Sequence, residues 1–521
     1  MDALPTEQAK RTPREPSFTD ALAPVLVLIG LLTLTIVLFG TDATLGPLQV
    51  ALFASAVFAG LIAMKNGYSS VVLREAMIGG VSSAMGAIFI LLAVGALIGT
   101  WNMAGTIPTV VSYGIALLRP AIFYAAVALI CAVVGMVTGS SWTTAGTLGV
   151  AFIGMAPILG MSTTIAAGAI ISGAYMGDKM SPLSETTILV PTLVGGVTVN
   201  EHIKGMLWTV VPSFVIAFAI FLVIGLTADP ASSALGVDEA RHLIAEVYNI
   251  SPINLLPLVL LIVFTLKQIP PFLSIFVVAL FSGILASFTQ STVVANFVGE
   301  PGQGAVLNGI EGIYKAMGTG FVLDSGNATL DKLFSGGGMT SMLSTVWLIL
   351  GALSFAAIME EAGMLRRLIR PIVHRAKSDA GLIASVAATS FGLNVLSGDQ
   401  YVAVVMPSRV YPEEFARRGL APRMLSRTVE DVGTVTSPLV PWNSCGAYMS
   451  GVLGVPTMSY LPFAFFNILN PLIALGYAFT GFHVEHVTPT ESPAPVIDSK
   501  PIAPSGDGAP APILQGDGHV D

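Results

Sequence analysis

Long apolar runs, separated by short polar stretches, recur along this chain. Residues 22–40 contain no charged side chain, and residues 206–228 form a second run of similar character. An α-helix needs roughly 20 apolar residues to cross a bilayer, so the pattern predicts an all-α polytopic membrane protein with about ten transmembrane helices. The other predicted spans are 47–64, 76–100, 253–267, 271–288, 338–360 and 460–482, with interrupted segments over 162–199 and 424–455.

The second half of the chain repeats the first. "TGSSW" at 138–142 matches "SGDQY" at 397–401, and "GDKMSPL" at 177–183 matches "GTVTSPL" at 433–439 at nearly the same spacing. Cytoplasmic loops are enriched in Lys and Arg, and a topology with the two halves inverted puts most of the 23 basic residues on one side. The sequence therefore predicts two inverted-topology repeats, an arrangement common in secondary transporters.

This arrangement divides the chain into five parts. They are a cytoplasmic N-terminal segment (1–20), transmembrane repeat 1 (21–228), an external linker (229–251), transmembrane repeat 2 (252–483) and a Pro/Ala/Gly-rich disordered cytoplasmic tail (484–521).

Each repeat is also expected to carry a hairpin and an amphipathic helix. The hairpins are expected over 121–155 and 380–409 and are interpreted as re-entrant, although the charge distribution also allows two full crossings. The segment 365–376 has apolar residues on one helical face and arginines opposite, which predicts a helix on the inner surface, with 106–119 as its counterpart.

Composition narrows the possible functions. Charged residues make up 10% of the chain, against about 25% in soluble domains. The net charge of −8 argues against a nucleic-acid partner. Two cysteines suggest no disulfide framework, the histidines show no metal-binding spacing, and no cofactor is expected.

A proline and several charges interrupt the apolar segment 162–199. Pro182 cannot donate a backbone hydrogen bond and its ring clashes with the carbonyl of Asp178, so the helix should break at 177–184. Broken helices at matching points of two repeats indicate a transport site. The residues expected to form the breaks are Gly177, Pro182, Gly433 and Pro438.

Oxygen-bearing side chains gather at these breaks and at the hairpin tips, as a site for a hard cation requires. The candidate ligands are Asp178, Asp399, Ser140, Ser141, Thr143, Thr144, Ser181, Glu185, Thr434, Ser437 and Asn443, together with carbonyls freed by the breaks. Lys179, Glu430 and Asp431 are expected to adjust the charge of the site, and Lys179 is a candidate partner of Glu185. Asp399 as a turn residue and Glu430 and Asp431 as helix caps are the structural alternatives.

An acid at membrane depth suggests how exchange would work. Burying a carboxylate there costs about 2.5–3.5 kcal/mol on insertion scales. Either a proton or a small cation relieves that cost, so the two would compete for Asp178, where a Na⁺ site is expected. If the loaded domain moves only when neutral, cation is exchanged for proton.

Several motifs resemble the NhaC-type Na⁺/H⁺ antiporter family of the ion-transporter superfamily. They are "GSSWTTAGTLG", "GAYMGDKMSPLSETT", "GTIP", "SGGGMTSML", "SGDQYVAVVMPSR" and "SPLVPWNSCGAYM". The resemblance implies proton-driven efflux of Na⁺ or Li⁺ across a bacterial inner membrane, by an elevator-like motion of a transport domain against a scaffold. Asp178 falls on the family's motif aspartate, whereas Glu185 stands where an aspartate is more usual. A homodimer with both termini in the cytoplasm is expected.

Other functions fit this sequence less well. Related members resemble malate/lactate exchangers, so a cation- or proton-coupled exchanger of small carboxylates is the main alternative. No arginine is predicted at membrane depth to grip a carboxylate, which favours cation exchange. An intramembrane aspartyl protease is a weaker alternative. A supporting glycine would be expected two residues before a Gly-Asp pair, but Tyr175 and Leu396 occupy these positions.

Overall fold

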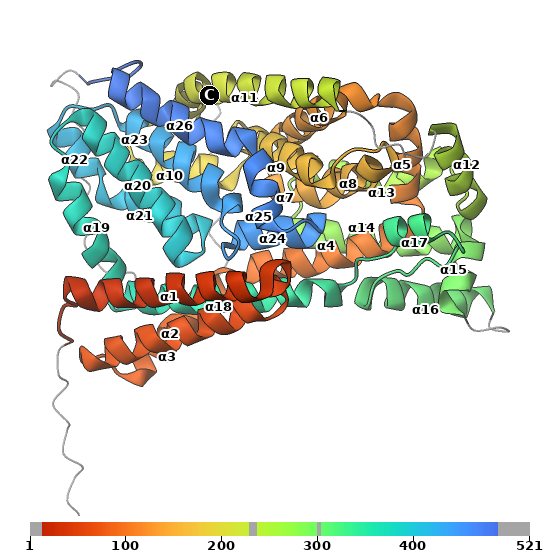
Figure 1. Cartoon of the computed structure of the whole chain (residues 1–521), viewed down its shortest axis with the longest axis horizontal. Coiled ribbons are helices and arrows are strands. Elements are labelled where there is room, and N and C mark those ends of the chain that lie inside the picture. The colour runs from red at the N-terminus through yellow and green to blue at the C-terminus, as the bar shows by residue number, and fades with distance from the viewer. Residues whose placement is uncertain (1–12, 229–236, 300–303, 488–521) are drawn as a thin grey trace, which may run out of the picture.

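The protein is a bundle of helices (Figure 1). The computed structural model describes residues 13–228, 237–299 and 304–487. In these three stretches there is no β-strand, only isolated bridges between Phe321 and Gly336 and between Leu420 and His486. The predicted all-α class is confirmed.

The described helices are long and apolar enough for eight membrane spans, or up to ten if each of two bent pairs is one span. The eight involve α1 (Phe18–Phe39), α2 (Pro47–Lys65), α4 (Met85–Met103), α6 (Phe123–Thr138), α11 (Val199–Thr227), α14 (Pro271–Thr289), α18 (Leu343–Glu361) and α20 (Asp379–Ser397). The bent pairs are α12 (Val237–Val247) with α13 (Leu256–Leu266) and α25 (Thr457–Tyr460) with α26 (Phe465–Thr480). This agrees with the prediction of about ten spans.

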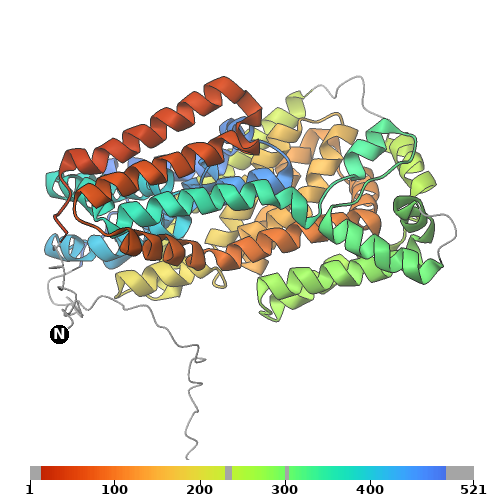
Figure 2. The same ribbon diagram turned by 90° about the horizontal axis from the view of Figure 1, so that it is seen from below.

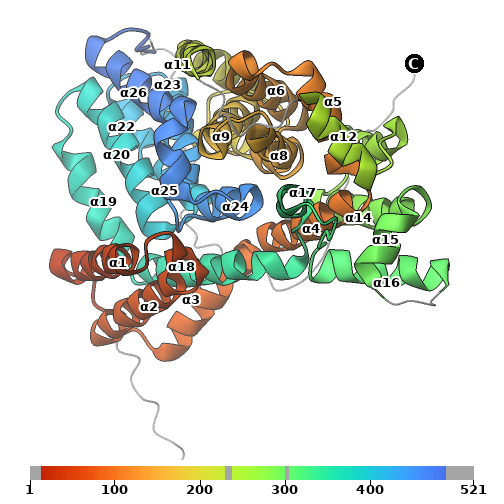
Figure 3. The same cartoon turned by 45° about the vertical axis from the view of Figure 1, so that its right-hand side comes forward.

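The helices form two layers. One layer contains α1, α2, α4, α14, α18 and α3 (Ser70–Ser83), and within it α18 packs on α2 and α3 while α4 packs on α14. It runs along the lower side in Figures 1 and 3 and faces the viewer in Figure 2. The other layer contains α6, α11, α20, α26, α9 (Thr163–Lys179), α21 (Gln400–Val410) and α23 (Pro422–Val429). Both hairpins and both interrupted segments lie in this second layer.

Glycines allow an unusually close approach of α6 and α9, whose contact is the most extensive between described helices. A Cβ atom at Gly173 would lie 2.1 Å from the carbonyl oxygen of Ala128, and one at Gly177 would lie 2.2 Å from that of Ala132. Small residues commonly permit such backbone contact between membrane helices. Gly177 was expected to help break α9, but it is helical and serves this contact instead.

Some of the remaining elements match the sequence expectations and others do not. The predicted span 76–100 is two helices, α3 and α4, separated at Ala84. Predicted amphipathic helices at 106–119 and 365–376 are present as α5 (Thr106–Leu117) and α19 (Met364–Arg375). The elements α12, α15 (Ser291–Val298), α16 (Ala305–Gly318) and α17 (Ala328–Phe334) were not predicted.

The chain after α26 remains attached to the fold. The backbone N–H of Ala421 donates to the carbonyl of Glu485 at 2.9 Å, and that of Val487 donates to Gly419 at 2.8 Å. Arg423 pairs with Glu485. The predicted disordered tail therefore begins too early at 484, and its remainder, 488–521, lies outside the described residues.

Candidate functional site

The two hairpin tips have the same local structure. Helix α6 ends at Gly139 (φ 66°) and α20 ends at Gly398 (φ 62°), both in the left-handed conformation that suits glycine. The next residue then caps the following helix: Ser140 Oγ accepts from the N–H of Thr143 at 3.1 Å, and Asp399 Oδ1 accepts from that of Val402 at 3.1 Å. Matched positions in the sequence thus share one structure, as an internal duplication predicts.

The capping role accounts for part of the chemistry predicted at these tips. Asp399 is buried and caps α21, which agrees with the alternative that it shapes a turn. In the first tip, Thr144 donates to the carbonyl of Ser140 at 2.9 Å, and Thr143 donates to Ser140 Oγ at 3.1 Å. These two hydroxyl protons are therefore engaged within the turn.

Asp178 connects the end of α9 to the first hairpin tip. Its side chain is buried, with 8% of the residue exposed, and Oδ2 accepts from the backbone N–H of Ser141 at 3.0 Å. Ser141 begins α7 (Ser141–Thr144), which continues through a π-helical turn into α8 (Val150–Ile158). A helix N-terminus favours a carboxylate. The other oxygen, Oδ1, is buried and has no hydrogen-bond partner.

At the first interruption, the backbone carbonyls that were expected to be free accept hydrogen bonds. Helix α9 ends at Lys179 and α10 (Glu185–Val194) follows, so the turn around Pro182 falls inside the predicted break. However, the carbonyl of Asp178 accepts from the N–H of Ser181 at 3.0 Å. The carbonyl of Lys179 accepts from Thr187 Oγ1 at 3.1 Å. A tight turn and a threonine thus replace the lost helical hydrogen bonds, and the expectation of bare carbonyls here was wrong.

The second interruption uses asparagines for the same purpose. A π-helical turn (Glu430–Thr434) contains Gly433, a 3₁₀ turn (Ser437–Leu439) contains Pro438, and α24 (Ser444–Leu453) follows. Buried amides donate to its carbonyls: Asn394 to Gly433 at 2.6 Å, Asn467 to Val435 at 2.8 Å and Asn470 to Asp431 at 3.1 Å. Sequence reasoning missed these asparagines. Isolated amides within apolar helices were the available signal, because a buried amide needs a partner.

Other predicted ligands of the second repeat also have protein partners. Ser437 donates to Gln400 Oε1 at 2.8 Å. Asn443 caps α24 by accepting from the N–H of Cys445 at 3.0 Å, and its amide donates to Asn394 Oδ1 at 3.1 Å. Asn443 is thus a structural residue here, whereas Thr434 Oγ1 is buried without a hydrogen-bond partner.

An ion pair joins the two interruptions. Lys179 Nζ lies 2.7 Å from Asp431 Oδ1, and neither side chain is exposed. The same oxygen accepts from Thr209 at 2.9 Å and from Asn470 at 3.0 Å. The expected pairing of Lys179 with Glu185 was wrong, because Glu185 instead binds the hydroxyl of Tyr401. A buried charge needs compensation of this kind, since an unpaired one would be strongly destabilising.

Arg427 is also buried. Only 2% of the residue is exposed, and its Nε lies 4.0 Å from Asp431 Oδ2. Arg427 lies one helical turn before Asp431, on a helix, α23, whose neighbouring residues are also buried. A buried guanidinium therefore stands at the edge of the charged cluster, a position that the sequence did not predict.

The remaining buried oxygens indicate what the cluster can bind. Asp178 Oδ1, both oxygens of Glu430, Asp431 Oδ2 and Thr434 Oγ1 have no hydrogen-bond partner. Within the described residues, no three His, Cys, Asp or Glu side chains are placed to hold a metal ion together. Carboxylate and hydroxyl oxygens are the donors that hard cations prefer.

A model of the Na⁺/H⁺ antiporter family matches residues 1–196 and 173–482. This chain belongs to the Na⁺/H⁺ antiporter family. Its relatives include the Na⁺/H⁺ antiporter NhaC of Alkalihalophilus pseudofirmus, 35% identical over 84% of this chain and 90% of that protein. The arginine/ornithine antiporter ArcD of Halobacterium salinarum is 34% identical over 93% and 96% of the two chains. The malate-2H⁺/Na⁺-lactate antiporter of Bacillus subtilis is 33% identical over 88% and 95%. The resemblance to NhaC-type proteins is confirmed, and this antiporter family includes members named for organic substrates.

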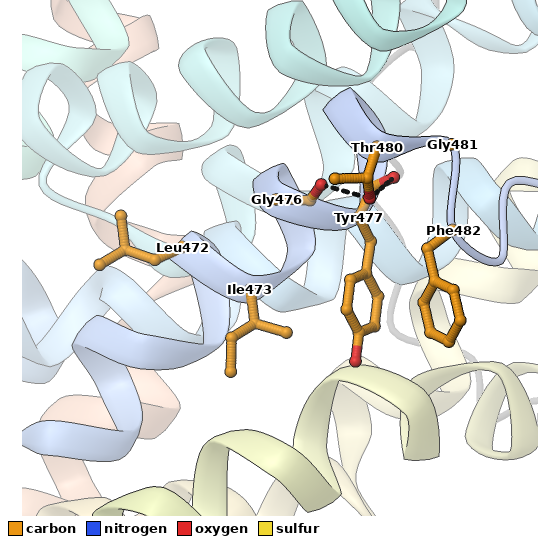
Figure 4. A pocket seen from close by; sticks show the side chains of 7 residues that line it. All are labelled: Leu472, Ile473, Gly476, Tyr477, Thr480, Gly481 and Phe482. Atoms are coloured by element: carbon orange, nitrogen blue, oxygen red, sulfur yellow. Dashed lines mark hydrogen bonds between the residues drawn. The ribbon is translucent and has the colours of Figure 1, made fainter.

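A groove on the surface of this antiporter is separate from the cluster. It follows α26 and the residues after it, and none of the candidate site residues lines it (Figure 4). Its wall consists of Leu472, Ile473, Gly476, Tyr477, Thr480, Gly481 and Phe482. This largely apolar wall lacks the charged groups of the cluster, so we place the candidate site at Asp178.

Proposed function

We propose that this antiporter exchanges Na⁺, or Li⁺, for H⁺, and that both ions compete for Asp178. The observation that carries the proposal is the buried Oδ1 of Asp178, which has no hydrogen-bond partner. An ionised carboxylate with an unsatisfied oxygen is costly inside a protein. A proton or a small cation removes that cost, so occupancy by one excludes the other.

The surroundings of Asp178 favour reversible binding. The N–H of Ser141 holds Oδ2 at 3.0 Å, which fixes the carboxylate while Oδ1 keeps its lone pairs available. The hydroxyls of Ser141 and Ser184 lie beside the same carboxylate. The N-terminus of α7 stabilises the carboxylate anion, which is the form that binds a cation.

The test is Asp178→Asn in everted membrane vesicles. We expect this isosteric change to abolish the Na⁺- and Li⁺-dependent collapse of an imposed proton gradient, followed by dye fluorescence. Asp42→Asn, in an exposed turn after α1, is the matched control and should exchange normally. Both variants must be present in the membrane and monodisperse in detergent. Full exchange by the Asp178→Asn variant would reject the site.

Exchange of small carboxylates is the second candidate. It is favoured by the buried guanidinium of Arg427, since arginine binds carboxylates well. Asp431 lies 4.0 Å from that guanidinium and already supplies an anion, so an arriving carboxylate would have to compete with it. Malate titrated into the same vesicle assay separates the candidates. A malate-dependent response without Na⁺ or Li⁺ would support the second.

The finer aspects of the transport cycle belong to this proposal. We place the protein in a bacterial inner membrane as a homodimer with cytoplasmic termini, taking part in sodium and pH homeostasis. The layer of α1, α2 and α18 would be the scaffold, and the layer with both hairpins would move in an elevator-like manner. The close contact of α6 and α9 supports this division, because the first hairpin and the first interruption would move together.

A further inference from the structure

We infer that Glu430 is a second carboxylate ligand of the transported cation, supplied by the second half of the chain to the site of Asp178. The inference rests on the proposed function and names a residue that would complete its site. Nothing in the relatives' names assigns such a role, and the sequence alone suggested only charge adjustment or helix capping for Glu430.

The first observation is the state of the Glu430 side chain. It is fully buried, and neither carboxylate oxygen has a hydrogen-bond partner. The hydroxyls of Thr186 and Thr434 lie beside the carboxylate, and Thr434 Oγ1 itself has no hydrogen-bond partner. Buried polar groups in native proteins are nearly always satisfied. An acid left open in this way indicates a ligand.

The neighbouring acid shows that this openness is not general. Asp431 Oδ1 is bound by Lys179, Thr209 and Asn470. The structure thus divides two consecutive acids between different tasks: Asp431 anchors the cluster, and Glu430 keeps both oxygens free. Both residues lie in a π-helical turn, a distortion that is frequent at functional sites.

Contacts between the two interruptions place Glu430 near Asp178. Lys179 and Asp431 are in contact at 2.7 Å, and each directly follows one of the two open acids in the chain. Two hydroxyls also connect the open acids: Ser184 Oγ, beside Asp178, lies 3.4 Å from Thr186 Oγ1, beside Glu430. The ammonium of Lys179 is bound to Asp431 and acts on Glu430 only without a direct bond, so neither open carboxylate has a lysine bound to it.

The charged groups around Asp178 and Glu430 carry a net negative charge that a bound cation would neutralise. Helix α9 contributes Asp178 and Lys179, and the segment of α23 and its π-helical turn contributes Arg427, Glu430 and Asp431. With these five buried groups ionised, three negative charges face two positive ones; Glu185 of α10, at an exposed position, adds a further negative charge near Asp178. One monovalent cation between Asp178 and Glu430 would balance the set, with Asp178 Oδ1, Thr434 Oγ1 and the Glu430 carboxylate as hard oxygen ligands.

The decisive experiment measures Na⁺ binding apart from transport. Purified full-length protein in detergent is unfolded thermally in NaCl and in choline chloride at equal ionic strength. We expect Na⁺ to raise the unfolding temperature of the wild type, as any ligand of the folded state does. Glu430→Gln should abolish this increment, while Glu75→Gln, which replaces an exposed acid in α3, should keep it.

Transport gives the second readout. In everted vesicles, Glu430→Gln should raise the Na⁺ concentration for half-maximal exchange at least tenfold, a change of about 1.4 kcal/mol in binding. Glu430→Asp keeps the charge but withdraws it by one methylene, so we expect an intermediate shift. If the Glu430→Gln variant does not fold, the Glu430→Asp variant serves instead, and a wild-type Na⁺ dependence for it overturns the inference.

The outcomes distinguish this inference from the proposed function. A Glu430→Gln variant with a lower unfolding temperature in choline but an unchanged Na⁺ increment has lost only structure, which overturns the inference. In that case the loss of exchange in Asp178→Asn vesicles would still support Asp178 as the exchange site. Conversely, full exchange by the Asp178→Asn variant rejects the proposed function whatever Glu430 does.

Discussion

At the scale of single residues, the site depends on contacts between distant parts of the chain. The sequence identified Asp178, Lys179 and Asp431, because charges within apolar segments are functional candidates by default. It did not identify their pairing. The Lys179–Asp431 bond joins residues 252 positions apart, and no local pattern encodes such a contact. The local neighbour Glu185 was a natural choice but lies at an exposed position next to Tyr401.

Removing one member of this ion pair should destabilise the protein strongly. Lys179→Met leaves Asp431 buried without its main counter-charge, and breaking a buried pair costs about 3–5 kcal/mol. The double variant Lys179→Met/Asp431→Asn leaves neither charge and should recover part of that loss. Unfolding temperatures of the two single variants and the double variant complete the cycle. Additive losses would show that the two side chains do not interact.

At the scale of elements, a tight backbone turn and polar side chains replace helical hydrogen bonds at the two interruptions. The positions of the breaks followed from Pro182 and Pro438, since proline cannot continue a helix. The hydrogen bonds that satisfy the carbonyls at these breaks could not be predicted, because donors such as Asn394 and Asn467 come from other helices. The separation of α3 from α4 at Ala84 has no proline or glycine at that residue to mark it, so hydrophobicity alone predicted one span.

The glycine contact between α6 and α9 should tolerate no side chain. Gly173→Ala would place a Cβ atom 2.1 Å from the carbonyl oxygen of Ala128, so the helices must separate. Overpacking of this kind costs about 1–3 kcal/mol. Gly205→Ala in α11 is the matched control, since nothing lies within 4 Å of its added Cβ and alanine favours a helix. Thermal unfolding should show a loss for the first variant and none for the second.

At the scale of the whole molecule, the duplication was the most informative feature of the sequence. It predicted matching hairpin tips, and Gly139 and Gly398 share their backbone conformation. It did not predict α15, α16 and α17, because no segment of the first half was matched to these residues in the sequence. The membrane orientation of the two halves remains a prediction from the distribution of basic residues.

Labelling from each side of the membrane tests that orientation. The substitutions Asp42→Cys, in the turn after α1, and Arg370→Cys, in α19, each replace an exposed residue. In a background lacking Cys131 and Cys445, a membrane-impermeant maleimide should label position 42 from the outside and position 370 from the inside. Labelling of both from the same side would contradict the inverted arrangement.

The long-range ion pair also has a consequence for biosynthesis. Lys179 is made 252 residues before its partner, a delay on the order of 10–50 s at about 5–20 residues per second. During that interval the ammonium has no counter-charge from Asp431. The candidate site therefore cannot be complete when the ribosome has made only the first half of the chain. It closes only when nearly the whole polypeptide has been inserted.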